Sequence, residues 1–255
     1  MVAYLRLEVL RVLRTPRFLL LAVLMPVAFY LIFTNLGTSD GGPDGPATAL
    51  AFMVSMACYG AIFAALSLVA GTIEDRTTGW MRQLRTTPLP AGRVVAAKLL
   101  TSMAVVLPTI SFVCLAAVID YGVQLGAGQW LALIAVLWVG AAPFALLGTA
   151  IGYLCTAQSS SLVNMAVVLG GVLLGGFWFP VSLLPGTLQH VAHALPFNRY
   201  ADLGWRIVAG HAPTTTDAAV LLAWCAAGAS SRSSGLRWCR RPATAPRRWT
   251  RSRPC

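Results

Sequence analysis

Five long apolar runs alternate with short polar segments along this chain of 255 residues. The runs cover residues 18–36, 49–71, 99–119, 130–154 and 162–179. A helix needs about 20 apolar residues to cross a hydrocarbon core about 30 Å thick, and each run reaches or nearly reaches that length. The pattern therefore predicts five membrane-spanning helices.

A sixth apolar run is shorter and ends abruptly. Residues 218–229 are almost all apolar, so we predict a weak sixth span at 218–234. Residues 230–255 then carry eight arginines and no acidic residue, a composition typical of a disordered tail. A GC-rich gene read in another frame yields such a composition. We therefore divide the chain into a membrane domain at 1–229 and a tail at 230–255.

Composition indicates an all-α integral membrane protein with about six transmembrane helices. The chain is 57% hydrophobic and only 11% charged, whereas a soluble domain carries about 25% charged residues. Six spans leave no room for a separate hydrolytic or DNA-binding domain. The net charge of +11 is therefore a signal of topology, and we expect no nucleic-acid partner.

The loop charges predict that both termini lie in the cytoplasm. Residues 1–17 carry four arginines and residues 72–98 carry five basic residues, while residues 37–48 and 120–129 carry none. Cytoplasmic loops are enriched in Lys and Arg, so 37–48 should face outward. Residues 2–15 place apolar side chains on one helical stripe, which predicts either an interfacial helix or a charged extension of the first span.

The segment between the fifth and sixth runs, residues 180–217, is too apolar for an ordinary loop. Leu188, Val191 and Leu195 recur at helical spacing between two prolines, Pro185 and Pro196. This predicts a short helix that re-enters the membrane or lies on its outer leaflet.

No catalytic, metal or cofactor site is expected in this chain. Lys98 is the only lysine, and its neighbours do not form a phosphate-binding loop. His190 and His193 lie three residues apart but lack a nearby cysteine or carboxylate cluster, so a metal site is disfavoured. The five long runs carry essentially no charge, which argues against an ion-coupled transporter or a cation channel.

Small and mildly polar residues inside the runs predict packing and a possible path. Glycines at 148 and 152 and at 171 and 175 form GxxxG pairs, which we interpret as packing within one bundle rather than a dimer seam. A path for a large amphipathic or apolar molecule is predicted from the polar and aromatic side chains Tyr30, Ser55, Tyr59, Ser67 and Asn164.

The densest motif is the cytoplasmic segment 74–90, with the sequence EDRTTGWMRQLRTTPLP. It predicts an amphipathic helix that ends at Thr-Pro, because the residue before proline disfavours the helical region. Its apolar side chains suit a cleft in a partner, and its arginines suit acidic partner groups. The predicted partner-coupling residues are Glu74, Asp75, Arg76, Gly79, Trp80, Met81, Leu84, Arg85, Thr87 and Pro88.

Two segments resemble the permease subunits of type-2 ABC exporters, in the branch that includes daunorubicin-resistance and other bacterial multidrug pumps. They are EDRTTGWMRQLRTTPLP followed by AAK at 96–98, and FPVSLLPGTLQHVAHALPFNRYADLGWR at 179–206. The resemblance covers about residues 1–229. It implies that 74–90 is a coupling helix docking into a separate ATP-binding subunit. It also implies that Pro180, Pro185 and Pro196 belong to an outward re-entrant pair.

The resemblance further implies an ATP-driven exporter of drug-like or amphipathic molecules in the bacterial cytoplasmic membrane. ATP and Mg would bind in the partner subunit, and two permease chains, identical or different, would join two ATP-binding chains. A lipid or glycan export permease and a non-transporting or inactive membrane subunit remain alternatives. An intramembrane enzyme is disfavoured because no span carries a constellation of Asp, Glu or His.

Overall fold

The computed structural model describes residues 16–38, 45–66, 71–73, 91–178, 181, 185–212 and 214–226. Within these ranges all regular structure is helical, and no strand occurs in them. A helix pairs its backbone groups internally, as a segment inside hydrocarbon requires. The described part of the chain is all-helical, as an all-α membrane protein requires.

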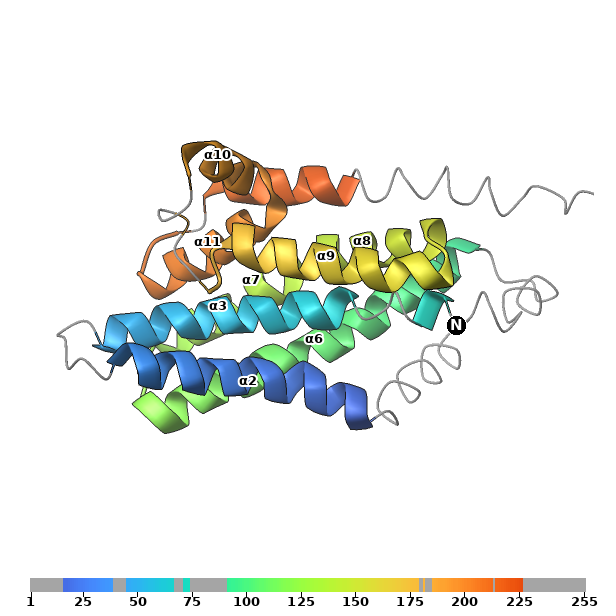
Figure 1. The fold of residues 1–255 in the computed structure, drawn as a ribbon. Helices are drawn as coiled ribbons and strands as arrows, with labels where there is room; N and C mark the ends of the chain where they lie inside the picture. Colours follow the sequence, from blue (N-terminus) through green and yellow to red (C-terminus); the bar gives the residue numbers. More distant parts are fainter. Residues whose placement is uncertain are drawn as a thin grey trace, which may run out of the picture.

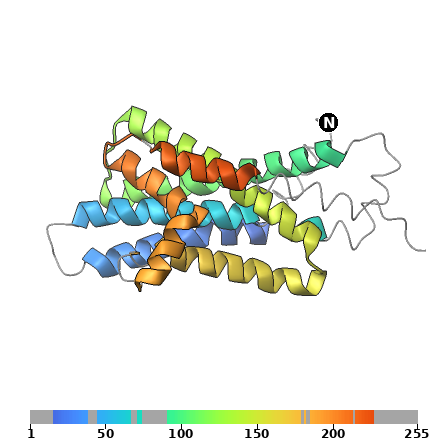
Figure 2. The ribbon, with the colours of Figure 1, turned by 90° about the horizontal axis from the view of Figure 1, so that it is seen from above.

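The helices run in one bundle whose long members lie roughly side by side (Figures 1 and 2). A last described helix, which carries no label, spans Thr215–Ala226. The labelled helices are α2 (Pro16–Thr38), α3 (Gly45–Leu66), α6 (Ala91–Tyr121), α7 (Ala127–Gly140), α8 (Ala142–Leu154), α9 (Ala157–Gly175), α10 (Gly186–Ala194) and α11 (Pro196–Val208).

Four helical stretches in the described part of the chain are long and apolar enough to cross a membrane. Two further apolar stretches, Ala22–Asn35 and Thr215–Ala226, are shorter. Each of the six predicted runs therefore overlaps an apolar helix. The four longer stretches are Thr48–Ile73, Ala96–Tyr121, Ala127–Tyr153 and Gln158–Gly175.

The predicted single span at 130–154 consists of two helices, α7 and α8, which meet at Ala141. Pro143 lies in the first turn of α8 and has no N–H to donate to the preceding turn. The amide of Ala141 bonds to the carbonyls of Trp138 and Val139. The carbonyl of Leu137 is thereby left free for another donor.

Helix α3 forms the centre of the bundle and contacts α2, α6, α7, α8, α9 and α11. Its small residues allow this close approach. A Cβ atom on Gly60 would lie 2.7 Å from the methyl group of Thr109 in α6 and 2.9 Å from the ring of Pro26 in α2. A larger residue at this position would push the two neighbours away.

Both GxxxG pairs pack against neighbours within the bundle, as the sequence predicts. A Cβ atom on Gly148 of α8 would lie 3.3 Å from the Ala65 carbonyl oxygen of α3. A Cβ atom on Gly171 of α9 would collide with the ring of Phe197 in α11. These glycines therefore bring α8 and α9 against their neighbours in the same chain.

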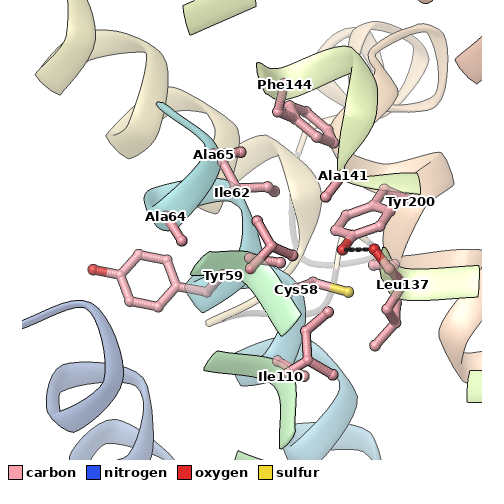
Figure 3. Close-up of a cluster of buried hydrophobic side chains, with 14 of the residues drawn as sticks. Cys58, Tyr59, Ile62, Ala64, Ala65, Ile110, Leu137, Ala141, Phe144 and Tyr200 are labelled. Carbon is pink, nitrogen blue, oxygen red and sulfur yellow. Dashed lines mark hydrogen bonds between the residues drawn. The ribbon is translucent and has the colours of Figure 1, made fainter. Parts of the chain in front are cut away.

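One face of α3, here called the sealed face, is closed by neighbouring helices. It consists of Val54, Cys58, Ala61 and Ala65, which recur every three or four residues and are completely buried. Tyr200 of α11 packs near this face, and its hydroxyl donates a hydrogen bond of 2.6 Å to the free carbonyl of Leu137 (Figure 3). The hydroxyl of Tyr200 thus pairs with the carbonyl that the break between α7 and α8 leaves without a donor inside the helix.

The short helix predicted between Pro185 and Pro196 is α10, with Pro185 as its N-cap residue. Pro196 begins a second short helix, α11, which the spacing of apolar residues did not predict, although the family resemblance implied a pair of elements here. The predicted interfacial helix at 2–15, the coupling segment at 74–90 and the tail at 230–255 lie outside the described residues.

Candidate functional site

Two cavities lie along a second face of α3, here called the open face. It consists of Thr48, Phe52, Ser55, Tyr59 and Phe63, again spaced by three or four residues. This spacing puts all five side chains on one side of the helix. In Figure 3 the ring of Tyr59 points away from Tyr200, toward the blue ribbon of α2. The open face therefore looks toward α2 at Tyr59 and toward α11 at the large cavity, whereas α8 and α11 close the sealed face.

The large cavity, of about 550 Å³, lies at the end of α3 that begins near Gly45. Its volume falls in the range of about 300–1,000 Å³ that is typical of small-molecule sites. Four aromatic rings and several polar groups line it: Phe52, Phe177, Trp178, Trp205, Thr48, Ser55, His193, Asn198 and Asp202.

The small cavity, of about 350 Å³, lies farther along α3, between α2 and α9. Trp178 borders both cavities, so its indole forms a shared wall. The other lining side chains are mostly apolar or aromatic: Met25, Phe29, Tyr59, Phe63, Met165, Val168, Leu169 and Val172, with Ser161 and Asn164 as the polar members.

Trp178 is held within a group of aromatic rings. Its ring centroid lies 5.6 Å from that of Phe29 and 6.5 Å from those of Phe33 and Tyr59. Its indole Nε1 and the Oδ1 atom of Asn164 are both buried, and neither has a hydrogen-bond partner among the described residues. An unpaired buried polar atom costs about 1–3 kcal/mol, so a ligand that paired with either atom would gain free energy.

A charge cluster joins α11 to the last described helix. Nη1 of Arg199 lies 3.1 Å from Oδ1 of Asp217, and Nε of Arg206 lies 3.7 Å from Oδ2 of the same carboxylate. Asp217 is only 1% exposed. Separating the two helices would leave the buried carboxylate of Asp217 without a counter-charge, which is costly. The cluster therefore fixes the start of the last helix against α11.

Asp202 lies on the same helix but takes no part in these ion pairs. Its carboxylate borders the large cavity and forms no ion pair or hydrogen bond with any residue that the structure describes. Helix α11 is not one of the candidate spans. Burial raises the pKa of Asp202 above its usual value, and the nearby charge of Asp217 raises it further, while Arg199, His193 and Arg206 oppose the rise.

His193 and Asn198 join the ends of three helices at this cavity. Nδ1 of His193 lies 3.0 Å from Oδ1 of Asn198, and Nδ2 of Asn198 donates a hydrogen bond of 3.4 Å to the carbonyl of Gly175. In the ranges that the structure describes, no group of three His, Cys, Asp or Glu side chains could hold a metal ion. The contacts of His193 and Asn198 thus link the ends of α10 and α9 to the start of α11.

The structure places the predicted path residues in different environments. Ser55 borders the large cavity, and Tyr59 and Asn164 border the small cavity. Tyr30 is completely buried in the core and lines neither cavity. Ser67 lies outside the described residues, as do Pro180 and every predicted partner-coupling residue.

Sequence reasoning missed the contribution of α11 to the site. Asn198, Asp202 and Trp205 reach the large cavity from this helix. The sequence carried one sign of this helix, an alternation of apolar and polar residues with a helical period. Phe197 and Ile207 are among its buried apolar positions, with polar residues between them. Because α11 is short and has little net hydrophobicity, a search for long apolar runs does not find it.

Comparisons with known proteins give two matches. The profile described as ABC-2 family transporter protein matches residues 43–229. A protein of Bacillus subtilis (strain 168) named "Putative transport permease YvfS" is 28% identical over 220 residues, which cover 85% of this chain and 89% of that protein.

Proposed function

The chain belongs to the ABC-2 family of transporter proteins, and we propose that it is the permease subunit of an ATP-driven exporter of drug-like or amphipathic molecules. The family and the apolar helices make it a multi-pass membrane permease, a transport subunit rather than an enzyme. ATP and Mg bind in a separate subunit, because the chain has no phosphate-binding loop.

The observation that carries this proposal is the pair of cavities along the open face of α3. The two cavities share Trp178 as a lining residue, and five side chains of α3 between Thr48 and Phe63 border them. Together they extend along much of a helix that is long and apolar enough to cross the membrane. Their lining combines aromatic rings with a few polar groups, which suits an amphipathic molecule. A lipid or glycan export permease is the alternative function.

Energy from ATP reaches the permease through segment 74–90, which we take to be the coupling helix. Family membership implies association with an ATP-binding subunit. In the proposed complex Trp80, Met81 and Leu84 fill a cleft in that subunit, Glu74 and Arg85 orient the helix, and the proline at 88 fixes its exit. The cleft contacts are mostly apolar, and such anchors dominate the free energy of many interfaces.

Leu84→Ala tests the coupling segment in a complex of the permease with its ATP-binding subunit, reconstituted in nanodiscs. Loss of one buried anchor commonly costs about 2 kcal/mol, or about thirtyfold in affinity. We expect the variant, and likewise Gly79→Trp, to insert and fold normally but to lose ATPase activity stimulated by transported molecules. Thr38→Ala, at the far end of α2, should leave that activity unchanged. Full stimulated ATPase in Leu84→Ala at an equal protein level would refute the proposed coupling.

A second permease chain, identical or different, completes the proposed exporter. The candidate span in α9 is 22% buried within the chain, against 50–78% for the other three. Its exposed side chains include Leu162, Met165 and Leu169, two of which border the small cavity. A partner chain on this side would cover the small cavity. The mass of the purified complex distinguishes one permease chain from two.

In the proposed topology the chain crosses the membrane six times, so both termini lie in the bacterial cytoplasm. The α10–α11 pair forms a re-entrant unit on the outer side. The family match ends at residue 229, where the apolar sequence also stops, so the tail at 230–255 is proposed to be a disordered addition. Ser39→Cys should react with an impermeant thiol reagent added outside intact cells. Reaction only in inverted vesicles would reverse the topology.

A further inference from the structure

The large cavity contains one acidic side chain, Asp202, which forms no ion pair with any residue that the structure describes. Three acidic residues lie in the described part of the chain. Asp120 is exposed near the end of α6, and Asp217 is engaged by two arginines. Of these three, only Asp202 borders the large or the small cavity. Asp202 is half-buried, and a partly desolvated carboxylate that forms no ion pair with the described residues gains free energy when a cationic ligand supplies the counter-charge.

Aromatic rings surround the same space and are held in place by the fold. Nε1 of Trp205 donates a hydrogen bond of 3.2 Å to the carbonyl of Ala51 in α3. Phe52 stacks on Phe33 with ring centroids 5.8 Å apart and planes 8° apart. Organic cations bind to the faces of Trp, Tyr and Phe rings, and cages of such rings recognise quaternary ammonium groups. Because these rings are already fixed, a ligand loses little free energy in ordering them.

The small cavity extends the site on the other side of Trp178. Its walls include Met25, Met165 and Val168, and none of its lining residues is acidic or basic. Methionine side chains adapt to irregular apolar shapes. The small cavity therefore adds an apolar surface next to the large cavity, on the other side of the Trp178 indole.

The arginines of the charge cluster do not neutralise Asp202 by contact. Arg199 and Arg206 both pair with Asp217, and Nε of Arg199 also donates a hydrogen bond of 2.9 Å to the carbonyl of His193. The Nδ1 atom of His193 faces Asn198. The two arginines therefore form their ion pairs with Asp217 and none with Asp202.

From this arrangement we infer that the large cavity binds the positively charged group of an amphipathic organic cation, held by the Asp202 carboxylate and by the rings of Phe52, Trp178 and Trp205. This inference rests on the proposed function, because it names the substrate class of the same path. Neutral lipids and anionic glycans lack the charge that Asp202 would recognise.

Direct binding to the purified full-length permease in nanodiscs tests the inference without the ATP-binding subunit. The probe is radiolabelled tetraphenylphosphonium, which has a permanent positive charge and an aromatic body. We expect Asp202→Asn to weaken its binding about tenfold or more, since the change removes the charge and keeps the size. Trp205→Leu should weaken it about threefold or more. Asp120→Asn is the matched control and should bind as the wild type does.

Two further measurements keep the result interpretable. Asp202→Glu should restore most of the binding, which separates a role of charge from a folding defect in Asp202→Asn. Triphenylphosphine oxide, a neutral molecule of similar shape, should bind the wild type and Asp202→Asn equally. Equal binding of the cation to Asp202→Asn and Asp120→Asn, or no binding of the cation to the wild type, would overturn the inference.

The binding assay tests the substrate class and the coupling assay tests the exporter, so a negative result in one leaves the other conclusion in place. If cation binding depends on Asp202 but no ATP-binding subunit couples to the chain, the site is correct and the exporter is wrong. If the reconstituted complex exports other molecules while cation binding is absent or independent of Asp202, the exporter stands and the proposed substrate class is wrong.

Discussion

The two faces of α3 are built from the same apolar helix but differ in what lies against them. On the sealed face, small residues such as Ala61 and Ala65 let other helices approach until no space remains. On the open face, large rings at Phe52, Tyr59 and Phe63 border cavities. Small side chains bring backbones together, whereas rings hold them apart and leave spaces of ligand size. One helix can therefore serve as the central support of the bundle and as the wall of a site.

The largest effect is expected from filling the sealed face. A Cβ atom on Gly204 of α11 would lie 2.5 Å from a methyl group of Val54 and 3.3 Å from Leu137. Gly204→Leu should therefore lower the unfolding free energy by about 3 kcal/mol or prevent folding. Gly170→Leu is the matched control, because a Cβ atom there meets nothing within 4 Å. Thermal unfolding of the two purified variants measures the difference. Equal stability would show that α11 is not tightly packed against α3.

A smaller effect is expected from one hydroxyl on each face. Tyr200→Phe removes the donor of the 2.6 Å bond to Leu137 and leaves that buried carbonyl unpaired, at a cost of about 1–2 kcal/mol. The hydroxyl of Tyr59 lies 4.0 Å from the sulfur of Met25, a weak contact, so Tyr59→Phe should change stability by less than about 0.5 kcal/mol. Denaturation of both variants in the same detergent tests the contrast. A larger loss in Tyr59→Phe would mean that the open face also supports the fold.

The contrast between the faces explains how far the sequence could predict the fold. The apolar runs predicted the long helices because hydrocarbon burial needs continuous apolar residues. The same continuity gives no prediction of which side of each helix faces the bundle, because a helix that is apolar on all sides has no distinct polar face. Tyr30 and Tyr59 have similar sequence settings and both are buried, yet Tyr59 borders the small cavity and Tyr30 lines neither cavity. Only the packing of neighbouring helices distinguishes them.

The site depends on residues that act together only after folding. Asp202 and Trp205 lie in a short amphipathic helix, and Phe52 lies about 150 positions earlier in the chain. No local spacing links them, because the large cavity forms where α11 packs on the beginning of α3. The pairing of Asp217 with two arginines, which leaves Asp202 without an ion pair among the described residues, is likewise a product of tertiary structure.

The most direct test of the account is the reactivity of single cysteines on the two faces of α3, in a variant whose native cysteines are replaced. Ser55→Cys borders the large cavity, whereas Ala61→Cys lies on the sealed face, where the native alanine is 0% exposed. A small, charged methanethiosulfonate reagent should modify Ser55→Cys at least about tenfold faster, with both variants equally stable. If the two cysteines react at the same rate, or if only Ala61→Cys reacts, α3 has no open face of the kind described and the proposed path is wrong.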